Sequence, residues 1–201
     1  MGAFIDNESS DSTLSPYSHA AGYTKCKRTE LVSCSDIRTA VMKLAGSNYN
    51  IPETNQYSDY KEMILEIKPD ILSVATQPEQ RAEVVLFAAN HGVKAIYAEK
   101  AMAASIEEVY EMATTCIQNN VAFNLGTNRR YHSGFNAMAN LIKSGSLGRL
   151  KSLISYRTGN LFNMGSHNFD LLLKLNNDSK VLSVTANLTQ PDWDSNQKEL
   201  K

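Results

Sequence analysis

Short apolar runs alternate with helix-like segments along the first two thirds of the chain. The apolar runs have the length of β-strands and stand at Glu30–Cys34, Ile71–Thr76, Val93–Ala98 and Val121–Leu125. Segments of about 10–15 residues with helical spacing of their apolar positions separate them. Because parallel strands need crossover connections that are usually helices, this pattern predicts βαβ units and an α/β fold with a Rossmann-like parallel sheet.

The segments between these runs carry helix start and stop signals. Helices are predicted at His19–Lys25, Ile37–Ala45, Tyr57–Ile67, Pro78–Asn90 and Ser105–Asn119. Ser105 and Glu108 have the spacing of a capping box, and Gly46 is expected to end the second helix. Residues 6–18 are polar and rich in turn formers, which indicates a long surface loop.

The last third of the chain follows a different order. Helices are predicted at Tyr131–Lys143 and Met164–Leu175, and strands at Leu150–Arg157 and Val181–Leu188. Two strands do not make a sheet that buries its own faces. We therefore expect two domains, residues 1–130 with the parallel sheet and residues 131–201 as the start of an α+β domain that is cut short.

Composition excludes several classes of protein. The 20 Lys and Arg residues nearly balance the 21 Asp and Glu residues and are scattered along the chain, so no basic footprint for nucleic acid is present. Cys26, Cys34 and Cys116 form no C-x-x-C pair, which argues against a zinc site and a disulfide framework, and no metal is predicted. Because neither a membrane-spanning run nor a signal peptide is visible, we expect a cytoplasmic protein without a membrane partner.

Polar residues follow several of the predicted strands. Right-handed crossovers place the carboxyl ends of parallel strands along one edge of the sheet, where open α/β sheets bind their ligands. Asp36, Thr76, Lys100 and the loop Gly126–Asn128 are therefore expected at one edge.

The run V-K-A-I-Y-A-E-K-A-M shows this edge most clearly. It is apolar until it ends in Glu99 and Lys100, and charge at the tip of a buried strand needs a reason. One reading is a solvated strand end; the other is a ligand site at the sheet edge.

Asp36 and the turn after Ile71–Thr76 are candidates for cofactor contacts. In a dinucleotide-binding fold, a carboxylate at the position of Asp36 accepts hydrogen bonds from the adenosine ribose and disfavours a 2′-phosphate, which favours NAD over NADP. Asp36 reads equally well as a helix N-cap. Thr76 and Pro78 either border the cofactor or serve only the turn.

His167 and Asp170 form a second group of titratable residues. They stand three positions apart in a predicted helix and so share a face. A neutral imidazole near a carboxylate suits a general base, and Lys and His together can polarise a hydroxyl and accept its proton. The alternative is a structural histidine.

Four motifs in consistent order carry a family resemblance. These are the stretch from Ile71 to Met102, G-T-N-R-R-Y-H at Gly126–His132, I-K-S-G-S-L-G at Ile142–Gly148 and N-M-G-S-H-N-F-D at Asn163–Asp170. Together they resemble the glucose-fructose oxidoreductase and inositol dehydrogenase family (Gfo/Idh/MocA), from about Gly2 to Leu188.

The resemblance implies a Rossmann domain for NAD(P), followed by a substrate domain with an open-faced antiparallel sheet. Glu99 and Lys100 match the family's E-K-P motif, whose lysine contacts nicotinamide and the reacting hydroxyl. His167 matches the usual acid/base histidine, and Asp170 a carboxylate on the substrate side. Asn128 matches a loop residue near the cofactor.

The chain departs from the family pattern at several places. Ala101 replaces the proline of E-K-P, Arg81 stands where many relatives have His, and Asn163, a substrate-binding candidate, stands where many have Asp. Of the family's G-x-G-x-x-G only the last glycine is matched, as the cofactor-binding candidate Gly2. The first strand and the rest of the second sheet have no counterpart, so we expect a fragment truncated at both ends.

These observations lead to one leading hypothesis and two alternatives. The resemblance implies an NAD(P)-dependent oxidoreductase, with NAD preferred, that moves a hydride between a sugar or polyol hydroxyl and nicotinamide. The alternatives are a non-catalytic regulator that binds nucleotide or ligand, and an inactive truncated product. The expected partner is a small sugar or polyol, and a homo-oligomer remains open for a full-length form.

Overall fold

The computed structural model describes residues 2–7, 16–157, 165–187, 193–194 and 199–200. The chain divides into two units, Met1–Gly126 and Thr127–Lys201. The first unit holds the parallel strands, and the longest elements among the described residues of the second are helices.

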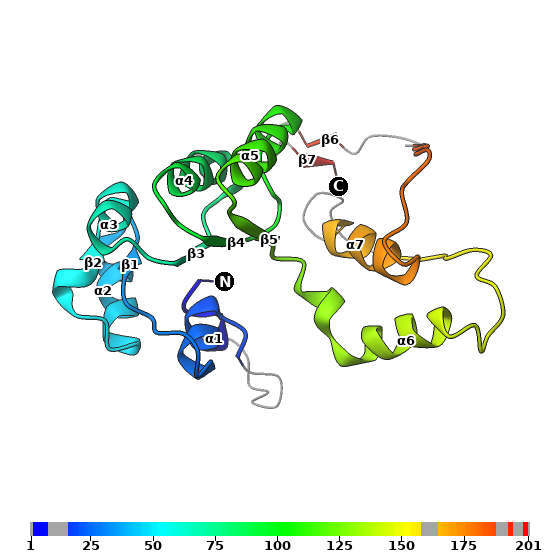
Figure 1. Ribbon diagram of the computed structural model, residues 1–201, viewed down its shortest axis with the longest axis horizontal. Helices are drawn as coiled ribbons and strands as arrows, with labels where there is room; N and C mark the ends of the chain where they lie inside the picture. Colours follow the sequence, from blue (N-terminus) through cyan, green and yellow to red (C-terminus); the bar gives the residue numbers. More distant parts are fainter. Residues whose placement is uncertain (1, 8–15, 158–164, 188–192, 195–198, 201) are drawn as a thin grey trace. The chain divides into compact units, whose positions relative to one another are not determined.

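A three-stranded parallel sheet forms the centre of the first unit (Figure 1). Its strands are β3 (Ile71–Val74), β4 (Ala95–Ala98) and β5 (Ala122–Leu125), in that order. Three of the four strands predicted in this part of the chain are therefore confirmed, and they pair in parallel as the βαβ pattern requires.

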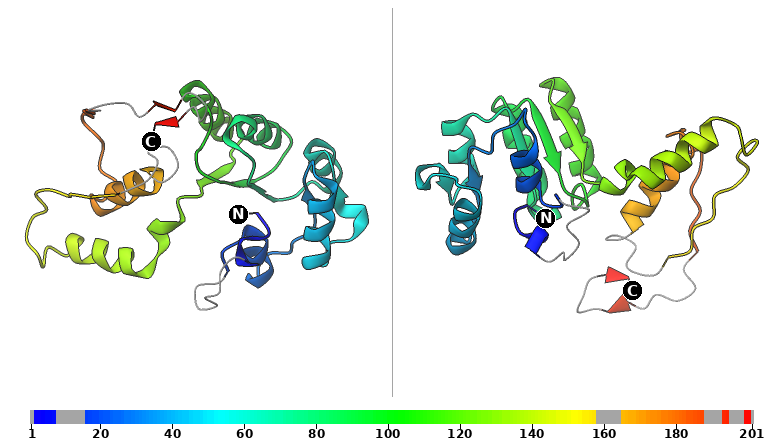
Figure 2. Two further views of the ribbon diagram at one scale, coloured as in Figure 1. Left: turned by 180° about the vertical axis from the view of Figure 1, so that it is seen from behind. Right: turned by 90° about the horizontal axis from the view of Figure 1, so that it is seen from below.

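One face of this sheet carries the apolar core. Leu72 and Val74 of β3 lie opposite Ile96 and Ala98 of β4, and all four are buried. Helices α4 (Pro78–Asn90) and α5 (Ile106–Gln118) cover this face and contact the strands and each other (Figures 1 and 2). Burial of these side chains supplies the main stabilisation of the unit.

The other face of the sheet is more polar and is covered by α1 (His19–Lys25). Ser73 lies opposite Tyr97, and α1 reaches both, because the Tyr23 hydroxyl bonds Ser73 Oγ at 2.9 Å and the His19 ring meets the Tyr97 ring edge-on. The strands thus alternate in polarity, with the apolar side chains toward α4 and α5 and the polar ones toward α1.

A second, two-stranded sheet precedes the first in sequence. The parallel strands β1 (Cys34–Ser35) and β2 (Gln56–Tyr57) pair with each other, and α2 (Thr39–Asn48) and α3 (Tyr60–Ile67) pack against them. Among the described residues, no strand joins β1 to β3. The order β2-β1, gap, β3-β4-β5 is that of a Rossmann-type sheet without its first strand, as the sequence predicts.

Several boundaries differ from the sequence predictions. The strand predicted at Glu30–Cys34 is only the two residues of β1. Gly46 does not end α2: it lies buried inside the helix, where an added Cβ would collide with the side chain of Gln56. The capping box is confirmed, because Ser105 Oγ accepts from the Glu108 amide and Glu108 Oε2 accepts from the Ser105 amide.

The second unit contains η4 (Asn128–Tyr131), α6 (Ser133–Lys143) and α7 (Gly165–Leu175). The two predicted helices are therefore present, and the short antiparallel pair β6 (Trp193–Asp194) and β7 (Glu199–Leu200) follows. The strands predicted at Leu150–Arg157 and Val181–Leu188 are wrong for the described residues of these segments, which have no strand partner. A half-buried strand needs a neighbour to accept its ladder bonds.

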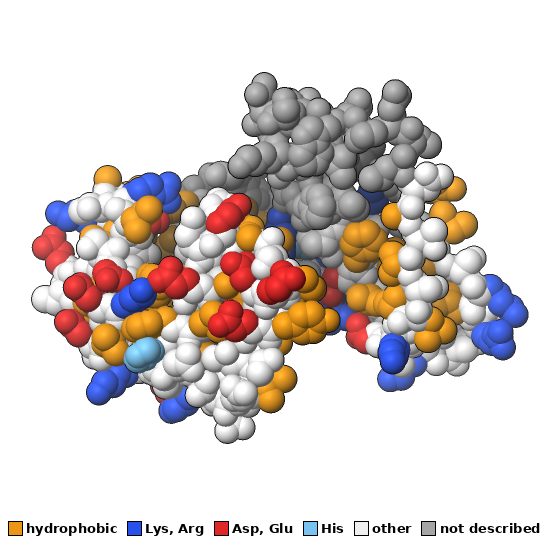
Figure 3. Space-filling model, turned by 90° about the horizontal axis from the view of Figure 1, so that it is seen from above, with side chains coloured by type: hydrophobic (Ala, Val, Ile, Leu, Met, Phe, Trp, Pro, Cys, Tyr) orange, Lys and Arg blue, Asp and Glu red, His pale blue; other side chains and the backbone are white. Residues whose placement is uncertain are grey.

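Short 3₁₀ turns complete the first unit at η1 (Ile5–Asn7) and η3 (Glu53–Asn55). Over the described residues of the face in Figure 3, acidic and basic side chains occur among apolar ones and form no continuous basic stripe. No helix in the described part of the chain is long and apolar enough to cross a membrane.

Candidate functional site

Lys100 stands two residues beyond the end of β4, at the carboxyl edge of the three-stranded sheet. The residue before it, Glu99, is buried and anchors this turn. Glu99 Oε1 lies 3.0 Å from His19 Nε2, and Glu99 Oε2 accepts from the Lys100 amide at 3.2 Å. The turn that carries Lys100 is therefore tied to α1 through one carboxylate.

The charge of Glu99 is stabilised inside the unit. Burial by itself raises the pKa of this carboxyl, but the hydrogen bond and charge of His19 and the Lys100 amide outweigh it, so the pKa falls below its ordinary value. The side chains of His19 and Glu99 are each only 8% exposed. Removing one partner of such a buried pair is costly, because the other is left desolvated.

Arg81 joins two loops at the same edge. Its side chain is 2% exposed, and its guanidinium donates to the carbonyls of Thr76, after β3, and Ala101, after Lys100. Burial lowers the pKa of this guanidinium, and the nearby Glu99 opposes that shift. Arg81 thus fixes the backbone on both sides of the edge where Thr76 and Lys100 lie.

The other predicted residues at this edge, Thr76, Pro78 and Gly126, follow β3 and β5 in the loops next to Arg81 and Glu99. Thr76 is exposed, and Pro78 is the first residue of α4. Gly126, after β5, donates its amide to the Ala98 carbonyl, and a Cβ there would come within 3.2 Å of Glu99. Only a glycine fits this close approach without a shift of its neighbours.

Asp36 follows β1, as predicted, but it is not an N-cap. The N-cap of α2 is Arg38, and Asp36 Oδ1 accepts both the Arg38 amide and Nε, while Oδ2 accepts Nη2 at 3.1 Å. The hydrogen bonds from Arg38 hold the pKa of Asp36 below its ordinary value despite partial burial. Because Arg38 is 69% exposed, this pair is weak and can exchange for another partner.

The start of α1 is where a Rossmann fold receives the cofactor's pyrophosphate. Here the amides are already bonded within the chain. Asp6 accepts from the Tyr17 and Ser18 amides at 2.6 and 2.9 Å, Ser18 Oγ accepts from Ala21, and the Gly2 carbonyl accepts from Ala20. The residues present therefore fit the ribose and nicotinamide ends of a dinucleotide, at Asp36 and Lys100, better than its pyrophosphate.

His167 and Asp170 lie on α7 of the second unit, as their spacing predicts. His167 is 9% exposed, and Asp170 Oδ1 lies 3.3 Å from Arg130 Nε. Arg130 also bonds Asp178 at 2.6 Å, and these two carboxylates raise the pKa of the guanidinium although burial opposes them. The negative charge of Asp170 is therefore compensated within the unit.

Two further candidates complete the predicted set. Asn128 is the exposed first residue of η4, in the second unit. Asn163 lies outside the described residues. In the described part of the chain, no cluster of three His, Cys, Asp or Glu side chains has an arrangement that holds a metal.

Sequence reasoning missed three residues of this arrangement. The sequence predicts a helix at His19 and a surface loop at Asp6, and it gives Arg130 no role beyond the motif Gly126–His132. Their contacts join positions 80, 11 and 40 residues apart in sequence, and no local pattern reports such pairs. In the sequence, Arg81 stands out only as a departure from the family pattern.

A family model described as "Oxidoreductase family, NAD-binding Rossmann fold" (GFO_IDH_MocA) matches residues 13–127, more than half of the chain. An uncharacterized oxidoreductase of Streptococcus pneumoniae is 31% identical over 102 residues, which are 51% of this chain and 28% of that protein.

Solved structures of similar fold include several dehydrogenases. Scyllo-inositol dehydrogenase from Lactobacillus casei, in its apo form, superposes with a TM-score of 0.69 at 20% identity over 78% of this chain and 50% of that one. An oxidoreductase from Agrobacterium radiobacter, solved with NAD+, L-tartaric acid and magnesium, gives a TM-score of 0.68 at 20% identity over 78% of this chain and 49% of that one. The chain thus spans about half the length of these structures, and at this identity they show the fold.

Proposed function

Because this chain belongs to the Gfo/Idh/MocA family of NAD-binding oxidoreductases, we propose that it supplies the cofactor-side and acid/base residues of a sugar or polyol dehydrogenase. The observation that carries the proposal is the turn after β4, whose backbone is held by buried side chains. There Glu99, His19 and Arg81 fix the backbone on either side of Lys100. A charged side chain so supported at the carboxyl edge of a parallel sheet suits a ligand site.

In this proposal Lys100 donates a hydrogen bond to the reacting hydroxyl. An ammonium beside a hydroxyl stabilises the negative charge that grows on oxygen as its proton leaves. Glu99 keeps the Lys100 backbone in place, and Thr76, Pro78 and Asn128 border the cofactor. Nicotinamide, when bound, supplies the hydride acceptor for alcohol oxidation.

His167 accepts the proton of the hydroxyl in the proposed reaction. It stands on α7, near the N-terminus of the helix, and is almost fully buried, so its ring is held by packing. Asp170 and Asn163 are proposed on the substrate side. Because Arg130 compensates Asp170, this carboxylate accepts hydrogen bonds from substrate hydroxyls without adding a net charge.

NAD is the proposed cofactor, with Asp36 accepting from the adenosine ribose. The carboxylate repels a 2′-phosphate, but Arg38 lies in contact with it and offsets part of that repulsion. The preference for NAD over NADP is therefore expected to be modest. Gly2 remains a candidate for the phosphate contact, although its carbonyl is engaged by Ala20. Kd values for NADH and NADPH, with Arg38→Ala as the variant, measure this preference.

A non-catalytic, ligand-binding role is the second candidate. One observation favours it: the Asp6 carboxylate occupies the amides of Tyr17 and Ser18, where a cofactor phosphate needs donors. Binding of NADH without turnover of any polyol would favour this role.

The test compares two lysines that flank the same strand. Lys100 follows β4 and Lys94 precedes it, where it pairs with the exposed Asp70. We expect Lys100→Ala to lower polyol-dependent NADH formation by about 100-fold or more while NADH affinity changes less than about threefold, since a group acting in the transition state contributes about 10²–10⁴-fold. Lys94→Ala should leave both unchanged. Equal turnover of the two variants would contradict the role given to Lys100.

A further inference from the structure

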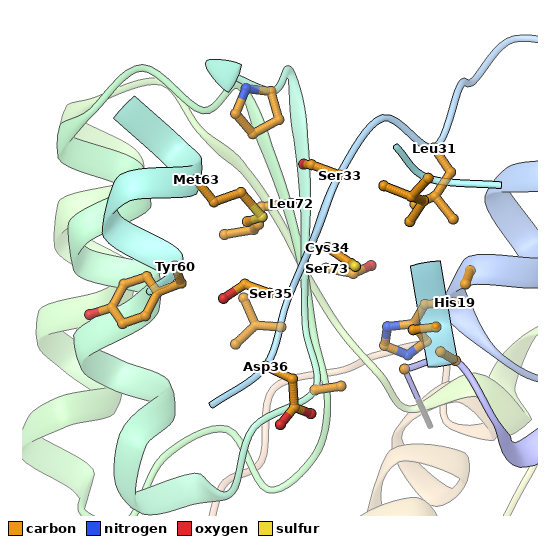
Figure 4. Close-up of a pocket in the computed structure, with 18 of the residues that line it drawn as sticks. His19, Leu31, Ser33, Cys34, Ser35, Asp36, Tyr60, Met63, Leu72 and Ser73 are labelled. Atoms are coloured by element: carbon orange, nitrogen blue, oxygen red, sulfur yellow. The ribbon is translucent and has the colours of Figure 1, made fainter. Parts of the chain in front are cut away.

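A cavity of about 1310 Å³ lies between β1 and β3 in the first unit, and its lining includes Ser33, Leu72 and Ser73 (Figure 4). A Rossmann sheet has its first strand at this place. The cavity therefore belongs to the fold and is not a further binding site. A network of charged side chains around Arg130, in the second unit, has no such explanation.

Arg130 holds two carboxylates of the second unit. Its Nε lies 3.3 Å from Asp170 Oδ1 on α7, and its Nη2 donates to Asp178 Oδ1 at 2.6 Å, in the turn after that helix. Arg130 itself belongs to η4. One side chain thus connects η4 to the middle of α7 and to the turn that follows it.

The backbone of Arg130 takes part as well. Its carbonyl accepts from the ammonium of Lys174, which also donates to Asn136 Oδ1 on α6. Lys174 follows Asp170 by four positions in α7, so their side chains leave the helix on the same face. A connected set of polar contacts therefore joins η4, α6 and α7.

The same face of α7 carries His167. This residue precedes Asp170 by three positions, and both His167 and Leu171 are buried. The helix face with the proposed acid/base residue is therefore the face that contacts Arg130 through Asp170 and Lys174.

The orientation of Asp170 depends on Arg130. The Asp170 side chain is 16% exposed, and its second oxygen, Oδ2, is buried without a hydrogen-bond partner among the described residues. A buried carboxylate that loses its counter-charge is strongly destabilised, and it moves into solvent or takes up a proton. Loss of Arg130 would therefore displace this turn of α7, and His167 with it.

We propose that Arg130 is a positioning residue, which fixes α7 against η4 and thereby holds the His167 ring where it meets the substrate hydroxyl. This role rests on the acid/base function proposed for His167. Asn128, the proposed cofactor contact, stands in the same 3₁₀ turn as Arg130, so the two proposed site residues are held in one piece. Arg130 acts through Asp170 and Asp178 and not by contact with the substrate.

The first test separates positioning from substrate contact. Arg130→Met should lower kcat for polyol oxidation by about 10–100-fold and change KM less than about threefold, because a misplaced acid/base group slows the chemical step and not binding. Arg130→Lys keeps the charge and should recover at least about threefold of this loss. Asp178→Asn, which alters an exposed partner outside α7, should lower kcat by about three- to tenfold.

The matched control is Arg129→Met, in the same turn, because both carboxylates pair with Arg130. It should leave kcat within about twofold of the unmodified chain. A KM that rises about tenfold at constant kcat in Arg130→Met would identify a direct substrate contact and overturn the proposal. Equal losses of kcat in the two methionine variants would overturn it as well.

The second test observes His167 without turnover. In the full chain, the imidazole NMR signal of His167 should be single and narrow, and it should broaden or split in Arg130→Met and Asp178→Asn but not in Arg129→Met. If Arg130→Met does not fold, Asp178→Asn decides in its place. An unchanged His167 signal in the folded variant would overturn the positioning role, whereas a narrow signal in a chain that oxidises no polyol would overturn the proposed reaction and not the contact.

Discussion

At the scale of single residues, Glu99 organises the candidate site as much as Lys100 does. Its two carboxylate oxygens reach different elements, His19 on α1 and the amide of Lys100 in the turn after β4. A charged tip on an apolar strand was visible in the sequence. The partner that makes the charge tolerable, 80 positions earlier in the chain, was not.

Glu99 should make the stability of the first unit sensitive to acid. Its folded pKa lies below the ordinary 4.5, so its stabilising contribution is complete above pH 4.5 and is lost as the pH falls through the folded pKa. Glu99→Ala should cost about 1–3 kcal/mol at pH 7, because it leaves the buried His19 ring nitrogen without its hydrogen-bond acceptor. Urea unfolding between pH 3 and pH 7 measures both effects.

The control for this prediction is the exposed Glu111 on α5. Glu111→Ala should change the free energy of unfolding by less than about 0.5 kcal/mol at any pH, as most surface substitutions do. Equal costs for the two variants would mean that the Glu99–His19 contact contributes no specific stability.

Asp6 should hold the segment before α1 in place. Burial by itself raises the pKa of Asp6, but the hydrogen bonds from Ser18 and Tyr17 together lower it by more, so the pKa lies below its ordinary value of 3.8. This stabilisation is present above pH 3.8 and is lost as the pH falls through the folded value. Asp6→Ala should therefore cost about 1 kcal/mol at pH 7 and increase amide exchange at Tyr17 and Ser18. Unchanged exchange at these two amides in the variant would contradict the assignment.

At the scale of elements, the sequence predicts the helices and strands whose signals lie in neighbouring residues. The strands β3 and β4, the capping box at Ser105 and the helix α7 all carry their signals within a few residues. The strands predicted at Leu150–Arg157 and Val181–Leu188 failed because alternation describes a face, while a strand also requires an edge to pair with.

The capping box provides the simplest test at this scale. Ser105→Ala removes the acceptor for the Glu108 amide and should cost about 0.5–2 kcal/mol, as the loss of an N-cap hydroxyl does. Ser105→Asp retains an acceptor and should restore most of the loss. Thermal unfolding of the three proteins checks this order, and an equally destabilised aspartate variant would exclude capping as the cause.

A substitution at Arg81 tests whether this side chain links the loops that follow β3 and β4. Arg81→Met keeps the aliphatic stem but leaves the carbonyls of Thr76 and Ala101 without their buried donor, which should cost about 1–3 kcal/mol. Hydrogen exchange should increase in the loops after β3 and β4 and remain unchanged in β5. If hydrogen exchange increased uniformly across the first unit, Arg81 would stabilise the unit as a whole and not these two loops in particular.

At the scale of the whole molecule, the chain is an α/β protein in which the parallel sheet is interrupted. The family match and the strand order agree on an NAD-binding Rossmann fold. Among the described residues, the amides of Tyr17 and Ser18 before α1 are bonded to Asp6, and β1 does not pair with β3. The contacts behind these features join segments that are distant in sequence, so no local pattern in the sequence predicts them.

The most direct test of the central claim is an amide NMR titration of the chain with NADH. We predict shifts at Asp36, Thr76 and Lys100, which follow β1, β3 and β4 at the carboxyl edge of the strands. Asp70 and Lys94, at the opposite ends of β3 and β4, should remain unchanged. Shifts confined to Asp70 and Lys94, or none at saturating NADH, would contradict the assignment of a dinucleotide site to this edge.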